Sequence, residues 1–110
     1  LPVRIKADPS MPLIIIATPD VTDCIDAMAR AAYNLGTCSN CSRPFYIPTI
    51  TSGLEGVHSA SSVHHRLGAL DWRTSDWPAG ARDFLLPKID KAKFRVRVET
   101  DHLHMERSRP

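Results

Sequence analysis

"KFRVRVETDHLHMER", residues 93–107, has the clearest strand pattern in the chain. Apolar Phe94, Val96 and Val98 alternate with charged residues, and successive side chains on a strand point to opposite faces. One face of this strand is therefore expected to be buried and the other to meet water. The run HLHMER continues with the same period of two, so the pattern predicts two strands near the C-terminus.

Three more segments upstream favour strands, and a fourth is expected at the edge of the sheet. Residues 13–17 (LIIIA) form a continuous β-branched run, typical of a strand buried on both faces. Residues 45–53 (FYIPTITSG) predict a strand interrupted by Pro48 and ended by Gly53, and residues 68–73 (GALDWR) predict a short one. Residues 3–7 (VRIKA) alternate, as an edge strand does.

Two segments predict helices. Residues 22–36 have Thr22 as the expected N-cap and Gly36 as the stop. Met28 and Tyr33 are expected in the core, and the apolar stripe recurs at helical spacing over Ile25, Met28, Ala32 and Leu35. Residues 76–89 (DWPAGARDFLLPKI) predict a second helix, with Asp76 as cap and Pro78 in the first turn, and Pro87 is expected to kink or end it.

Length and composition indicate a single domain over residues 1–110. The apolar content of 43% and the charged content of 24% are ordinary for a globular protein. A net charge of +2 is too small to argue for a nucleic-acid partner. No apolar run approaches the roughly 20 residues that span a bilayer, and the first ten residues show no signal-peptide pattern.

Three cysteines leave several interpretations open. Cys38 and Cys41 form the motif CSNC, and Cys24 stands apart. One CxxC is consistent with half a zinc site, a redox pair, a local disulfide or a loop with reduced thiols. No second CxxC completes a four-cysteine cage.

Four of the five histidines lie in two short clusters, each beside an acidic residue. The first cluster is SSVHHRLGALDW (residues 61–72), and the second is ETDHLHME (residues 99–106). Imidazoles and carboxylates are zinc ligands, and a catalytic zinc keeps three protein ligands and one water. On a strand His102 and His104 face the same side, and Asp101 or Glu99 is a candidate to take a proton from the bound water. The clusters therefore favour a shared metal site.

These residues resemble the zinc D-Ala-D-Ala carboxypeptidases and peptidoglycan endopeptidases, whose fold is shared with the hedgehog amino-terminal signalling domain. The quoted clusters are similar to their pattern SxHxxGxAxD followed by D-x-x-H-(apolar)-E, over about residues 49–108, and this run looks like the small phage-associated members. The resemblance implies an α+β fold with a small antiparallel sheet and two or three helices.

The resemblance also implies a Zn²⁺ cofactor held by His64, Asp71 and His104. One position departs from the pattern, because Leu67 stands where the family has glycine and Gly68 follows it. That departure leaves His65 as an alternative first ligand, although the spacing from His64 to Asp71 fits the pattern.

The remaining site roles follow from the same resemblance and from residue chemistry. Asp101 matches the general base, with Glu99 as the rival, and His102 is placed to bind the developing oxyanion. Ser62 is expected to touch substrate or orient the ligands, and Arg66 is a candidate to clamp a substrate carboxylate, with a plain surface position as the alternative.

The function implied is a zinc metallopeptidase that cuts peptidoglycan stem peptides or their cross-links, as a carboxypeptidase or an endopeptidase. The setting implied is a phage lysin or virion component that acts on the cell wall, with other virion proteins as further partners. The alternative is a zinc-bearing binding or structural module of the same fold without turnover, because fold does not fix function. A third hypothesis is a metal or redox protein based on the cysteines.

Overall fold

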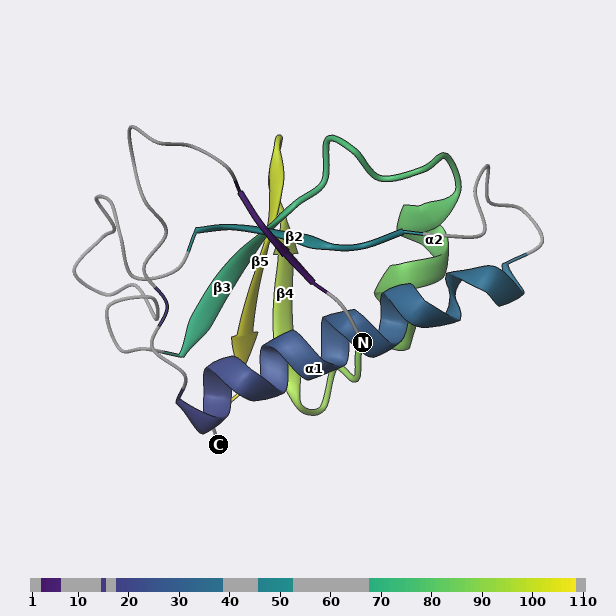
Figure 1. The fold of residues 1–110 in the computed structure, drawn as a ribbon. Coiled ribbons are helices and arrows are strands. Elements are labelled where there is room, and N and C mark those ends of the chain that lie inside the picture. Colours follow the sequence, from purple (N-terminus) through teal and green to yellow (C-terminus); the bar gives the residue numbers. More distant parts are fainter. Residues whose placement is uncertain (1–2, 7–14, 16–17, 39–45, 53–67, 109–110) are drawn as a thin grey trace.

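A computed structural model describes residues 3–6, 15, 18–38, 46–52 and 68–108. It is an α+β fold in which a five-stranded sheet packs against a long helix (Figure 1). The elements, in chain order, are β1 Arg4–Ile5, α1 Pro19–Tyr33, the 3-10 turn η1 Asn34–Thr37, β2 Thr49–Ser52, β3 Ala69–Arg73, α2 Ala81–Leu85, the 3-10 turn η2 Leu86–Lys88, β4 Phe94–Val98 and β5 His102–Arg107.

The strand order across the sheet is β1-β2-β3-β5-β4. The pairs β2–β3, β3–β5 and β4–β5 are antiparallel, whereas β1 pairs with β2 in parallel. The sheet is therefore mixed, and the expectation of an antiparallel sheet is wrong for its β1 edge. The long connection through α1 allows this, since parallel neighbours need a crossover between them.

Most of the strand predictions hold where the structure describes the chain, but the strand expected over residues 45–53 is confirmed only for residues 49–52, because residues 46–48 are not in a strand. β4 and β5 lie in the stretch with period two, β3 lies within GALDWR, and β1 is an edge strand as expected. β2 begins directly after Pro48, which has no backbone N–H to give to a sheet. The strand expected over residues 13–17 lies outside the described residues except for Ile15, which is not in a strand.

Helix α1 begins earlier than the sequence pattern predicts. Its N-cap is Thr18, whose Oγ1 accepts a hydrogen bond from the Val21 N–H at 3.2 Å. Pro19 follows at the first helical position, where its fixed φ and missing N–H cost nothing. The prediction of Thr22 as cap is wrong, because that residue already lies in the first turn and its hydroxyl donates to the Pro19 carbonyl. The α-helix ends at Tyr33, and the turn η1 carries the chain past Gly36.

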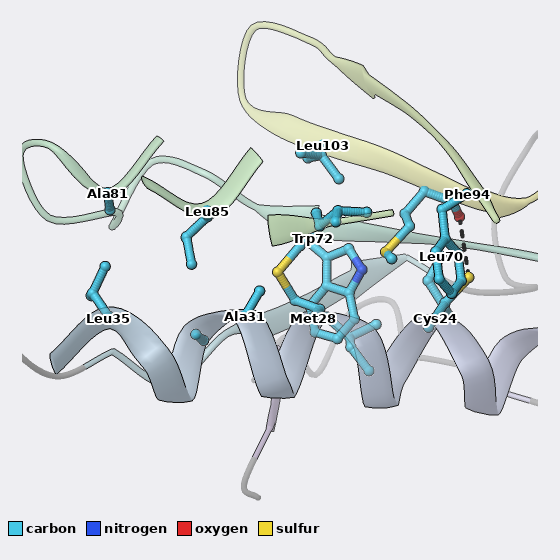
Figure 2. Packing of buried hydrophobic residues seen from close by; sticks show 14 of the residues in the cluster. Cys24, Met28, Ala31, Leu35, Leu70, Trp72, Ala81, Leu85, Phe94 and Leu103 are labelled. Atoms are coloured by element: carbon cyan, nitrogen blue, oxygen red, sulfur yellow. Dashed lines mark hydrogen bonds between the residues drawn. The ribbon is translucent and has the colours of Figure 1, made fainter. Parts of the chain in front are cut away.

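The core lies between α1 and one face of the sheet (Figure 2). Met28 is fully buried, as expected, but Tyr33 is 71% exposed and was wrongly expected inside. At 3.6 residues per turn Tyr33 falls outside the buried stripe, which consists of Val21, Cys24, Met28, Ala31, Ala32 and Leu35. This stripe packs on side chains of β3 and β5, namely Leu70, Trp72, Leu103 and Met105.

The second helix is shorter than predicted. α2 starts only at Ala81, after Gly80, whose φ of 85° lies in the left-handed region that glycine tolerates. Asp76 is not its cap, because the Asp76 carboxylate instead accepts a hydrogen bond from the Tyr46 hydroxyl at 2.8 Å. Pro87 lies in η2, directly after α2, so the predicted end is confirmed. Within the described segments no helix is both long enough and apolar enough to cross a bilayer.

Leu103→Ala should lower the free energy of unfolding by about 2–5 kcal/mol, because Leu103 is fully buried beneath α1 and truncation leaves a cavity. Ile5→Ala is the matched control, since Ile5 is 60% exposed and should change the same quantity by no more than about 0.5 kcal/mol. Urea unfolding followed by circular dichroism measures both. Equal losses in the two variants would contradict the assigned core.

Candidate metal centre

The sheet face that turns away from α1 carries the acidic and imidazole side chains of β3 and β5. Leu103 and Met105 point toward α1, so the intervening residues of β5 point to the other face. On β3 the same alternation sends Trp72 inward and Asp71 outward. The outward set on the two strands includes Asp71, His102, His104 and Glu106.

The register between β3 and β5 brings Asp71 opposite His104. The Oδ1 atom of Asp71 lies 3.2 Å from the Nδ1 atom of His104. The side chains are only 14% and 11% exposed, respectively. Residues 33 positions apart in the chain thus meet as a directly opposed cross-strand pair, the closest side-chain neighbours that a sheet provides.

His102, on the outward face of β5, lies between the carboxylates of Asp71 and Asp101. Its Nε2 atom is 3.8 Å from Asp71 Oδ2, and its Nδ1 atom is 2.8 Å from Asp101 Oδ1. Asp101 is 82% exposed. The hydrogen bond from His102 is the main cause that lowers the pKa of the Asp101 carboxyl below its ordinary value of 3.8.

Glu99, the rival candidate for the general base, is engaged elsewhere. Its carboxylate forms an ion pair with the guanidinium of Arg97 on β4, and its backbone N–H donates to the His102 carbonyl at 2.8 Å. Of the two acids, Asp101 is the one whose side chain is hydrogen-bonded to His102.

Glu106 is part of this group, although it was not among the predicted site residues. Its Oε1 atom lies 3.3 Å from the Nε2 atom of His104, and its side chain is 15% exposed. The period of two that puts His102 and His104 on one face also puts Glu106 there. The strand alternation in the sequence could therefore have predicted that Glu106 joins the two histidines.

Several predicted site residues lie outside the part of the chain that the structure describes. These are Ser62, His64, His65 and Arg66, together with Cys41 of the CSNC motif. Cys38 is disulfide-bonded, which favours the disulfide interpretation of that motif. Cys24 is a free thiol in the core, where burial raises its pKa to about 12.

Asp71 and His104 fit two ligand positions of a zinc ion. A tetrahedral zinc with nitrogen and oxygen ligands at about 2.0–2.2 Å holds two ligand atoms roughly 3.3–3.6 Å apart. The 3.2 Å between Asp71 Oδ1 and His104 Nδ1 is close to that spacing, and it also suits a direct hydrogen bond. Among the described residues no group of three or more His, Cys, Asp or Glu side chains is arranged to hold a metal ion, so a zinc ion at this pair would need a third ligand from the rest of the chain.

Comparisons with known proteins add no relative from which a role could be transferred. No family model matches the sequence, and no curated protein or solved structure matches it either. The similarity to the zinc peptidases therefore rests on the quoted motif residues, and the site stands on the geometry of this chain.

The pKa of Asp101 should depend on His102. The hydrogen bond favours the charged carboxylate, so it stabilises the fold above the unfolded-state pKa, and this contribution is lost as the pH falls through the lowered folded-state pKa. Carboxyl-carbon NMR titration should therefore give a pKa below 3.8 in the native chain and a value back toward 3.8 in His102→Leu. The same pKa in both would contradict the stated cause.

Proposed function

We propose that this chain is a zinc-dependent metallopeptidase of the hedgehog/D-Ala-D-Ala peptidase type. Its substrates would be peptidoglycan stem peptides or their cross-links, cut by carboxypeptidase or endopeptidase action. The observation that carries the proposal is the 3.2 Å contact between Asp71 and His104. These residues come from two separate motif segments, and the motif resemblance implies a metal-ligand role for each of them.

The proposed ligands are His64, Asp71 and His104. A zinc ion held there supplies a polarising charge for a peptide carbonyl and a water that ionises near neutral pH. His64 is proposed from the motif spacing alone, whereas Asp71 and His104 are also neighbours across β3 and β5.

His102 and Asp101 are the proposed proton-handling groups. His102 turns Nε2 toward Asp71 and is held at Nδ1 by Asp101. With zinc bound, its water would give a proton to Nε2 of His102, and the Asp101 carboxylate would stabilise the resulting imidazolium. The Nε2–H would then donate a hydrogen bond to an oxyanion or pass its proton to a leaving amine. In this arrangement Asp101 acts through His102. Ser62 and Arg66 are proposed to contact the substrate, on their motif positions.

A phage lysin or virion component that reaches the cell wall is the setting that the motif resemblance supports. A zinc-bearing module without turnover has the same expected ligand set, so metal content alone does not separate the two functions. Turnover of cell-wall peptide separates them.

The purified chain should contain about one zinc ion, and His104→Ala and Asp71→Ala should lose it, because each variant removes a proposed ligand. His102→Ala is the matched control. It removes an imidazole two residues from His104 on the same strand face and should keep the metal. Elemental analysis after gel filtration measures the metal content. Full zinc content in His104→Ala would rule out the proposed ligand set.

The zinc-loaded chain should release new amino groups from purified peptidoglycan. His102→Ala should slow this release by roughly 10²-fold or more while keeping zinc, because it removes the proton-handling group. Asp26→Asn is the control and should cleave at the native rate, since Asp26 is on the exposed side of α1, paired with Arg30. A zinc-loaded native chain that releases no amino groups would favour the non-catalytic module.

A further inference from the structure

β4 forms one edge of the sheet, because the strand order is β1-β2-β3-β5-β4. Among the described residues its one neighbouring strand is β5. The opposite edge, β1, is only two residues long, whereas β4 runs over five residues. An edge strand presents backbone N–H and C=O groups on which another chain can pair. β4 is therefore the edge of this sheet that is long enough to receive an added strand.

Two backbone hydrogen bonds at the ends of β4 show which of its residues pair with β5. The Glu99 N–H donates to the His102 carbonyl at 2.8 Å, and the Ser108 N–H donates to the Lys93 carbonyl at 2.8 Å. In an antiparallel pair, residues that exchange hydrogen bonds alternate with residues whose N–H and C=O groups point away from the partner. The register is unbroken between these two points, so the odd-numbered residues of β4 face β5.

The even-numbered residues of β4 therefore turn their backbone groups to the open edge. Val96 and Val98 present both N–H and C=O there, and nothing in the described part of the chain bonds to these groups. The Phe94 N–H is occupied, because it donates to the Asp90 carbonyl at 2.9 Å. The free hydrogen-bonding positions thus lie toward the C-terminal half of β4.

The side chains along this edge form an apolar groove with a positively charged rim. The groove has a volume of about 510 Å³. Its apolar lining comes from Leu86, Phe94, Val96 and Val98, and its charged lining comes from Lys91 and Arg95. Val96 and Val98 are half-buried and pack against the core beneath α1. An added strand would therefore place every second side chain against this apolar surface.

Arg95 and Arg97 project from the opposite face of β4, where both are exposed. Arg97 pairs with Glu99. Among the described residues Arg95 forms no ion pair, because Glu106, its cross-strand neighbour, contacts His104 instead. The edge thus carries a positive charge without a carboxylate partner, on the face opposite to the apolar groove.

We propose that the β4 edge binds an extended peptide segment of a partner protein in which apolar and acidic side chains alternate. The peptide backbone pairs with Val96 and Val98, its apolar side chains enter the groove, and its carboxylates meet Arg95 and Arg97. Backbone pairing supplies affinity in this kind of recognition, and the alternate side chains supply specificity. No metal takes part, so this contact is independent of the proposed zinc function.

A second copy of this chain fits the edge less well than an acidic peptide does. If two β4 strands pair about a twofold axis through Val96, Arg95 of one copy lies opposite Arg97 of the other. Like charges that face each other across two strands destabilise the pair. Charged side chains on an edge strand also hinder self-association, and a purely protective role of the arginines predicts that no peptide binds.

Amide hydrogen exchange, followed by NMR on the purified full chain, tests the backbone pairing. In the free chain the N–H groups of Val96 and Val98 should exchange quickly, and those of Arg95 and Arg97 slowly. The probe is a pentapeptide of alternating Glu and Val with acetylated and amidated ends, added up to millimolar concentration. It should slow exchange at Val96 and Val98 by roughly tenfold. Unchanged exchange at these two residues would overturn the proposal.

The affinity of the labelled peptide, measured by fluorescence anisotropy, tests the chemistry of the partner. A peptide with Lys in place of Glu should bind at least about tenfold more weakly, because its charges meet the arginines. Arg95→Gln should weaken binding of the Glu peptide by about two- to fivefold. Arg30→Gln is the matched control and should bind normally, since Arg30 lies on α1 and pairs with Asp26. Equal affinities for the Glu and Lys peptides would rule out an acidic partner.

Val96→Pro isolates the contribution of the edge-facing N–H, and a proline at such a position is tolerated in an edge strand. It should weaken binding by roughly tenfold relative to Val96→Ala, which also shortens the side chain but keeps the N–H. Equal affinities in the two variants would contradict pairing at this edge. If Val96→Pro does not fold, the exchange rates of the native chain still decide. Protection of Val96 and Val98 that grows with protein concentration, without peptide, would identify a second copy as the occupant and overturn the proposal.

Discussion

The pairing of β3 with β5 is the constraint on which the rest of the structure depends. It aligns five residue pairs in antiparallel register, from Ala69 with Glu106 to Arg73 with His102. On one face this register stacks Trp72 and Leu103 beneath α1. On the other face it sets Asp71 against His104. A slip of one residue would exchange the two faces of a strand, so burial of the apolar side chains also fixes the polar contacts.

The periodic elements were predictable from local pattern. β4 and α1 repeat their apolar residues with the periods of strand and helix, and burial follows those periods. The ends of the helices were not predictable in the same way. Thr18 and Thr22 are equally suitable caps by residue type, and Pro19 between them decides the outcome. In the same way α2 begins after Gly80, whose backbone is left-handed. Asp76 does not cap this helix, because its carboxylate accepts a hydrogen bond from the Tyr46 hydroxyl.

The candidate site was predictable only in its residue types. Motif spacing selected Asp71 and His104 as partners, but their contact depends on a strand register that residue spacing does not give. Glu106 was missed because it was considered as part of a motif and not as the next outward position on β5. The parallel pairing of β1 with β2 was also not predictable, because it depends on how the chain returns to the sheet after α1.

The order of the strands has a consequence for how the chain folds during synthesis. β5 lies between β3 and β4, yet it is the last of the sheet strands to leave the ribosome. Until β5 emerges, β4 has no neighbouring strand and β3 pairs only with β2. Helix α1 then has only part of the apolar sheet face to pack against. The apolar side of β3 therefore lacks its partner strand until residues 102–107 are available, and the native sheet closes in a late step that joins distant segments.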